Sequence, residues 1–255
     1  MNTLLKWTAA LAGAIAVLTA HASLLGVRDE SSAVLPESYT ELDWIESDGN
    51  CGIVTDYFWN GDGVRVEIDA MWNANGGYWQ SLVCATSDNT DAANASGYCF
   101  AVSKPYAGSS QPLWFWWDDG IWNAVDRNSV SLTQFHKVVA YKSSTSVYDT
   151  GFKIIVDGAS KTTTNTGWNP ISKKPPVYPL TFFCRLPVGY QTPTQYFDIA
   201  KLRRMKIYSS HEGGDVLADF VPVLQNGTGA VGLLDCVSAK FYVKVGNGVF
   251  GYAYK

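Results

Sequence analysis

The chain has 255 residues, of which 19 are basic and 23 acidic, so its formal net charge is −4 at pH 7. This balance argues against binding to nucleic acids or to anionic membranes, because both attract proteins with an excess of positive charge. Sugars or proteins are therefore the better candidate partners. The 47% of hydrophobic residues is enough to build a folded core.

The first 22 residues have the pattern of a signal peptide. They combine a single positive charge at Lys6, an apolar stretch from Trp7 to Leu18, and the small-x-small triplet Ala20-His21-Ala22. The apolar stretch is shorter than the roughly 20 residues that a membrane-spanning helix needs. We therefore expect cleavage after Ala22, export to the periplasm, the cell surface or the extracellular space, and no membrane span in the mature chain.

Residues 23–38 form a polar leader or linker that contains Asp29-Glu30-Ser31-Ser32 and ends near Pro36. Its apolar content is too low for independent folding. The folded part is expected to be one domain over residues 39–255, because all-β chains of this length are often a single domain.

From Tyr39 onward, short runs rich in β-branched and aromatic residues alternate with Gly, Asn, Asp and Pro clusters. The clearest predicted strand is Val64–Trp72, in which apolar and charged residues alternate, as in a half-buried strand. The other predicted strands are Leu42–Glu46, Trp79–Ala85, Tyr98–Val102, Leu113–Trp117, His136–Tyr141, Phe152–Val156, Leu180–Arg185, Arg204–Tyr208, Val216–Val221, Val231–Asp235 and Lys240–Val245.

Seven Asp-Gly or Asn-Gly dipeptides predict tight reversals between these strands, because both residue types tolerate positive φ. They are Asp48-Gly49, Asn60-Gly61, Asp62-Gly63, Asp119-Gly120, Asp157-Gly158, Asn226-Gly227 and Asn247-Gly248. Many strands without a convincing helix predict an all-β protein in which two sheets pack together or one sheet closes into a barrel. The chain has no internal repeat of fixed period, which disfavours a propeller.

Two stretches carry a family resemblance. The first is Leu42–Trp72, and the second, Arg204–Tyr252, contains Asp219-Phe220-Val221-Pro222, Gly232-Leu233-Leu234-Asp235 and Lys240-Phe241-Tyr242. These stretches resemble bacterial and phage secreted proteins with a LamG-like jelly-roll domain, of the concanavalin A-like lectin/glucanase kind. Leu234 stands where that family usually has an aromatic residue. The resemblance implies a two-sheet antiparallel β-sandwich and carries over no functional residues.

Glycosidases of this fold use a strand with two glutamates around an aspartate. Here Glu67-Ile68-Asp69 has the first half of that pattern, but residues 70–72 are Ala, Met and Trp. Retaining hydrolysis needs two carboxyl groups about 5–5.5 Å apart across the scissile bond. Because the second glutamate is missing, we expect the protein not to be an enzyme.

Tryptophan is concentrated in a short segment that contains Trp114, Trp116, Trp117 and Trp122. On a strand, Trp114 and Trp116 share one face while Trp117 lies on the other. Displayed indole rings offer a flat apolar surface to a sugar ring. We therefore predict a carbohydrate site made of Trp114, Trp116 and Trp122, with Asp118, Asp119 and Asn123 as hydrogen-bonding neighbours. The alternative is that these aromatic residues belong to the core.

No cofactor is expected to be required. The loops Asp88-Asn89-Thr90-Asp91 and Asp118-Asp119 carry oxygen ligands that suit calcium, so calcium is the metal that the chain could bind. The five cysteines Cys51, Cys84, Cys99, Cys184 and Cys236 are odd in number and imply no particular pairing. His136 and His211 belong to no recognisable catalytic motif.

The sequence thus leaves three functions open, in the following order. The first is a non-catalytic carbohydrate-binding or adhesion module whose partner is a glycan or a cell-surface protein. The second is a glycan-active hydrolase with an unrecognised site. The third is a structural cell-surface protein without a small ligand.

Overall fold

The strand pattern is most regular in β3 (Arg65–Trp72), where half-exposed and buried residues alternate without interruption. Arg65, Glu67 and Asp69 lie on the half-exposed face, while Val66 and Ile68 are among the buried residues. This is the period of two that places successive side chains on opposite faces of a sheet. The prediction of a half-buried strand at this position is confirmed.

A computed structural model describes residues 35–59, 65–72, 80–86, 98–104, 113–117, 121–125, 131, 133–142, 152–160, 163–165, 178–186 and 198–255. In β6, β7 and β11, and in β5 apart from Val102, the description is limited to the backbone. The described ranges contain no helix that is long and apolar enough to cross a membrane.

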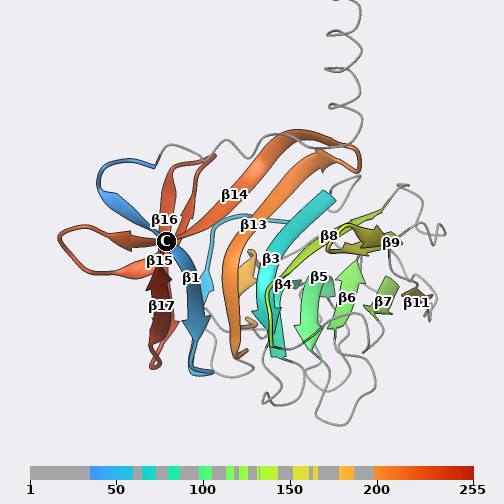
Figure 1. The fold of residues 1–255 in the computed structure, drawn as a ribbon, viewed down its shortest axis with the longest axis horizontal. Coiled ribbons are helices and arrows are strands. Elements are labelled where there is room, and N and C mark those ends of the chain that lie inside the picture. Colours follow the sequence, from blue (N-terminus) through green and yellow to red (C-terminus); the bar gives the residue numbers. More distant parts are fainter. Residues whose placement is uncertain are drawn as a thin grey trace, which may run out of the picture. The chain divides into compact units, whose positions relative to one another are not determined.

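The described part of the chain is all-β, and hydrogen bonds join its seventeen strands into one antiparallel network (Figure 1). Besides β3, the strands are β1 (Tyr39–Ser47), β2 (Cys51–Val54), β4 (Gln80–Thr86), β5 (Tyr98–Lys104), β6 (Leu113–Trp117), β7 (Ile121–Val125), β8 (His136–Lys142), β9 (Phe152–Val156), β10 (Ala159–Ser160), β11 (Thr163–Asn165), β12 (Thr181–Phe182), β13 (Ala200–Ser210), β14 (Gly213–Gln225), β15 (Val231–Asp235), β16 (Lys240–Gly246) and β17 (Phe250–Tyr254).

The network contains two long runs of paired strands. One run has the order β9-β8-β3-β13-β14-β15-β16, with β1 paired to β13, β14 and β17. The other run has the order β11-β7-β6-β5-β4-β12-β2-β16. Strand β16 therefore belongs to both runs, pairing with β15 on one side and with β2 on the other.

One hydrophobic core takes side chains from both runs. Val66, Ile68 and Ile207 come from the first run, and Val83 and Phe182 from the second. The rings of Phe182 and Phe220 meet edge to face with their centroids 4.9 Å apart. Burial of apolar area on this scale is the main source of stability in a domain of this kind.

The predicted reversal at Asp157-Gly158 is confirmed, whereas at Asn247-Gly248 neither residue has a positive φ and the positive φ belongs to Gly246. Asp157 and Gly158 have φ values of 50° and 78°, which make the tight reversal between β9 and β10. The predicted strand Leu180–Arg185 is shorter in the structure and covers only Thr181–Phe182, because Phe183 adopts a positive φ of 59° and interrupts the extended backbone. Strands β2, β7, β10, β11 and β17 are absent from the strands predicted from the residue pattern.

Candidate functional site

The tryptophan-rich segment folds into an antiparallel hairpin of β6 and β7. In its register, Trp116 pairs with Trp122, Trp114 pairs with Ala124, and Phe115 pairs with Asn123. Directly paired positions share a face, and successive positions on a strand alternate. Positions 114, 116 and 122 therefore lie on one face of the hairpin.

The neighbouring strand β5 relates the two faces of the hairpin to the core. Val102 of β5 is fully buried in the hydrophobic core and pairs with Phe115. Trp114 and Trp116 pair instead with Ser103 and Ala101, the positions on either side of Val102. The three tryptophan positions thus lie on the face opposite to the one that Val102 directs into the core.

Three hydrogen-bonding neighbours, Asp118, Asp119 and Asn123, are predicted beside these tryptophans. Asn123 pairs with Phe115 and therefore shares the face of Val102 rather than the face of Trp116. Asp118 and Asp119 belong to the segment between β6 and β7 and lie outside the described residues. The register thus brings the three tryptophan positions to one face, and the binding roles of these residues, of Asn123 and of the two aspartates stay predictions.

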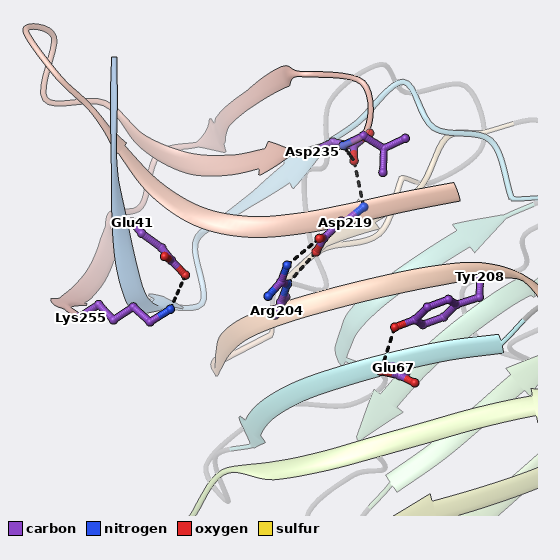
Figure 2. Close-up of polar contacts among 8 residues, drawn as sticks. Glu41, Glu67, Arg204, Tyr208, Asp219, Asp235 and Lys255 are labelled. Carbon is purple, nitrogen blue, oxygen red and sulfur yellow. Dashed lines mark hydrogen bonds and ion pairs between the residues drawn. The ribbon is translucent and has the colours of Figure 1, made fainter. Parts of the chain in front are cut away.

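The half-motif of β3 has the surroundings of a structural ion pair. An oxygen of the Glu67 carboxylate lies 2.5 Å from the guanidinium of Arg65. Its other oxygen accepts a hydrogen bond of 3.2 Å from the Tyr208 hydroxyl (Figure 2). Burial, and then the Glu67 charge, raise the pKa of Tyr208 to about 12. The strands on either side place Lys206 and Val139 opposite Glu67. A second carboxyl group does not occupy either of these paired positions.

The residues of the closing motifs form a polar network that joins strands β13, β14 and β15. Arg204 donates two hydrogen bonds of 2.7 and 2.6 Å to the carboxylate of Asp219 (Figure 2). The backbone N–H of Asp219 donates in turn to Asp235, whose carboxylate also accepts from the hydroxyl of Ser238. Such a charged, bidentate pair is strong and has a defined geometry. We assign these motif residues to the architecture of the sheet.

A second motif contact joins strand β16 to the loop after β2. Asp56, in the loop after β2, accepts hydrogen bonds from the ammonium of Lys240 and the hydroxyl of Tyr242. These two bonds lower the pKa of Asp56. Burial and the Asp56 contact raise the pKa of Tyr242. The Lys-Phe-Tyr motif therefore anchors the loop after β2.

His136 also has a structural position. Its ring nitrogens lie 2.7 Å from a carboxylate oxygen of Asp157 and 3.0 Å from the backbone carbonyl of Ser131. The side chain is almost fully buried. It thus connects the start of β8 with the turn after β9.

Among the residues that the structure describes, no group of three or more His, Cys, Asp or Glu side chains could hold a metal ion. Asp88, Asp91, Asp118 and Asp119, on which the calcium prediction rests, lie outside the described ranges. Calcium binding therefore stays a prediction.

Three of the described cysteines, Cys51, Cys184 and Cys236, differ in their exposure. Cys51 and Cys184 are fully buried, and burial raises the pKa of both thiols. Cys236 is partly exposed, and burial followed by the nearby Asp219 raises its pKa to about 11. Since the thiolate is the reactive form, all three should react slowly.

We expect Cys51 and Cys184 to react with N-ethylmaleimide at least ~100-fold more slowly than Cys236 in the native protein, because their exposure requires unfolding. Peptide mapping by mass spectrometry after timed labelling measures each residue separately. Labelling in 6 M guanidinium chloride is the control and should equalise the three rates. Equal rates in the native state would contradict the buried positions of Cys51 and Cys184.

Sequence comparison with protein-family models gives no match, and comparison with curated proteins gives none either. Structural comparison finds a crystal structure from Bacteroides ovatus ATCC 8483, described as a "putative carbohydrate binding protein". The two structures superpose with a TM-score of 0.51 and are 9% identical in sequence. The match covers 84% of this chain and 60% of the Bacteroides chain. At this identity the comparison shows a shared fold alone.

Proposed function

We propose that this chain is a non-catalytic carbohydrate-binding or adhesion module that acts after export, in the periplasm, at the cell surface or outside the cell. The observation that supports this most is the register of β6 and β7, which gathers Trp114, Trp116 and Trp122 on the face opposite to the core position Val102. Indole rings stack on the C–H faces of sugars, and the net charge of the chain does not favour nucleic acids. The name of the structurally similar Bacteroides protein agrees with this proposal.

The proposed architecture behind the site is a two-sheet sandwich of the concanavalin A-like jelly-roll kind. It is supported by the two runs of paired strands and by the core to which both contribute side chains. The resemblance of the first and last strands to LamG-like domains supports it as well.

The proposed partner is a glycan, free or attached to a cell-surface protein, and binding requires no cofactor. If Asp118 or Asp119 holds calcium, the ion would order the loop between β6 and β7 and assist binding without taking part in chemistry. The alternative function, a glycan-active hydrolase, has no support from Glu67, because its carboxylate is bound by Arg65 and Tyr208.

The replacement Trp116→Ala tests the proposal. We expect it to weaken glycan binding about 30-fold, as is common for a tryptophan that carries much of a binding energy. The free energy of unfolding should change little, because Trp116 is placed on the face away from the core. A glycan array with the protein from Ser23 to Lys255, followed by titration calorimetry on the best glycan, measures the effect.

Trp117→Phe is the matched control, because residue 117 lies on the opposite face of the same strand. It should lower the free energy of unfolding and leave affinity unchanged. Failure of the parent protein to bind any glycan, with reducing-sugar release also absent, would contradict the proposed function.

A further inference from the structure

Strand β17 is an edge strand of the described network. It pairs antiparallel with β1, and no other described strand runs beside it. Figure 1 shows it next to β1, at the opposite end of the network from β8 and β9. We propose that this edge is an interface between two copies of the chain, in which the two β17 strands pair antiparallel about a two-fold axis at Tyr252. This pairing involves none of the residues of the proposed carbohydrate site.

The backbone of β17 is accessible to a partner. Gly251, whose surface is almost entirely backbone, is exposed. A Cβ added to this glycine would have Glu46 and Trp44 as its nearest neighbours, at 3.8–3.9 Å, and both belong to β1. Alternate N–H and C=O groups of an antiparallel strand point away from its neighbour. Those of β17 that point away from β1 therefore need water or another strand as their partner.

Strand β17 lacks the features by which sheet edges usually avoid association, namely charged side chains, proline and bulges. Its five residues are Phe, Gly, Tyr, Ala and Tyr, and the shift of register between β1 and β17 adds a residue to β1. The next residue, Lys255, is bound within the chain, because its ammonium lies 2.7 Å from the carboxylate of Glu41 in β1 (Figure 2). An uncharged and regular edge of this kind favours pairing with another strand.

The order of residues in β17 matches a second copy of the same strand. Aromatic and small residues alternate, and the strand reads the same in residue class from either end. A two-fold axis at Tyr252 sets Phe250 opposite Tyr254 of the second copy, and Gly251 opposite Ala253. Every aromatic residue then faces an aromatic one, which stabilises a strand pair, and no like charges meet. A two-fold interface requires this self-complementarity, so the pattern favours a second copy over an unrelated strand.

The aromatic side chains of β17 form a row on the face that β1 turns to the core. Phe250 and Tyr252 pair with Ser47 and Ile45, which are both fully buried. Phe250 packs against the core, whereas Tyr252 and Tyr254 are exposed, and their rings meet edge to face with centroids 5.6 Å apart. A second copy would continue the sheet and cover these two rings. Removal of their apolar surface from water favours association.

The length of β17 limits the strength of the interface. Five residues of extended chain span about 17 Å. One pair of such strands buries less than the roughly 1,200 Å² at which interfaces of standard size begin. We therefore expect a reversible dimer with a dissociation constant on the order of 10 µM.

Sedimentation velocity of the chain from Ser23 to Lys255 tests the proposal. Between about 1 µM and about 200 µM, the sedimentation coefficient should rise from that of a monomer to nearly that of a dimer. A protein that is still monomeric at the highest concentration would overturn the proposal.

Tyr252→Lys tests whether the dimer uses β17. It places two ammonium groups opposite each other at the two-fold axis and should weaken dimerisation at least about 30-fold. Val243→Lys is the matched control, because Val243 is 50% exposed, close to the 40% of Tyr252, but lies in β16, which pairs with β15 and β2 on its two sides. The control should dimerise like the parent protein. Unchanged dimerisation of Tyr252→Lys would place the interface elsewhere.

Charge complementation tests the position of the axis. Tyr252→Glu should dimerise as weakly as Tyr252→Lys, because each charge meets its own copy. An equimolar mixture of the two variants should dimerise at least about tenfold more strongly than either alone, because opposite charges then meet. If the mixture sediments as the sum of its two components, the two strands do not pair about Tyr252.

Hydrogen exchange of the parent protein provides a measurement that does not depend on the folding of any variant. The amides of β17 that face away from β1 should exchange about fivefold more slowly at about 200 µM than at about 1 µM, because the dimer protects them. Peptides from β3 are the internal control, because this strand pairs with β13 and β8 on its two sides. Exchange in β17 that is independent of concentration would overturn the proposed interface.

Discussion

Replacement of Gly232 with alanine is expected to lower the free energy of unfolding by about 3 kcal/mol, which is the upper end of the usual range for overpacked sites. An ideal Cβ at this position would lie 2.2 Å from the backbone oxygen of Tyr242 and 2.9 Å from the ring of Phe241. A backbone oxygen cannot move aside as the end of a flexible side chain can. Strands β15 and β16 would have to separate, with loss of their packing and of hydrogen bonds between them.

Urea unfolding followed by tryptophan fluorescence measures this effect through the midpoint and the slope. Gly251→Ala is the matched control, because Gly251 also lies in a strand and its Cβ would meet neighbours only at 3.8–3.9 Å. The control should change stability by less than about 0.5 kcal/mol. Equal stability of the two variants would contradict the close approach of β15 and β16.

Replacement of Asp219 with asparagine is expected to lower the free energy of unfolding by about 2–3 kcal/mol, because it breaks a mostly buried ion pair while one charge remains. The Asp219 side chain is 9% exposed and that of Arg204 is 21% exposed. Asparagine has nearly the same shape, but it presents an N–H₂ group to one of the two donors of Arg204. The two short hydrogen bonds to the carboxylate therefore cannot both be kept.

Asp43→Asn is the control for Asp219→Asn. Asp43 pairs with Arg203 at 3.0 Å, but its side chain is 34% exposed and that of Arg203 is 36% exposed. Exposed pairs of this kind contribute about 0–1 kcal/mol. The same urea experiment should therefore show a clearly larger loss of unfolding free energy for Asp219→Asn than for Asp43→Asn. Equally small losses in the two variants would show that the pair of Arg204 and Asp219 does not stabilise the fold.

The strands could be predicted because their signals are local. In β3, the alternation of charged and apolar residues is visible within eight positions, and the structure has the same alternation of half-exposed and buried residues. The reversal at Asp157-Gly158 could be predicted for the same reason, since positive φ depends on the residues of the turn itself. Strand β12 was predicted too long, because the positive φ of Phe183 has no signal in the residue type.

The candidate site could be predicted only in part. The alternation along residues 113–117 places Trp114 and Trp116 on a common face, but it does not say which face is turned from the core. The pairing of Phe115 with the buried Val102 supplies that answer. Asn123 was grouped with the tryptophans because it is close in sequence; in the register of the hairpin it pairs with Phe115, and its role stays a prediction.

The sequence by itself determined the all-β class, most of the strands and several of the turns, because period-two patterning and turn chemistry act between near neighbours in the chain. Only the tertiary structure decided which distant residues meet. Asp56 contacts Tyr242 across 186 positions of sequence, and Glu67 contacts Tyr208 across 141. Such contacts depend on which strands become neighbours and in which register, and this is set by the packing of the whole core rather than by any local pattern.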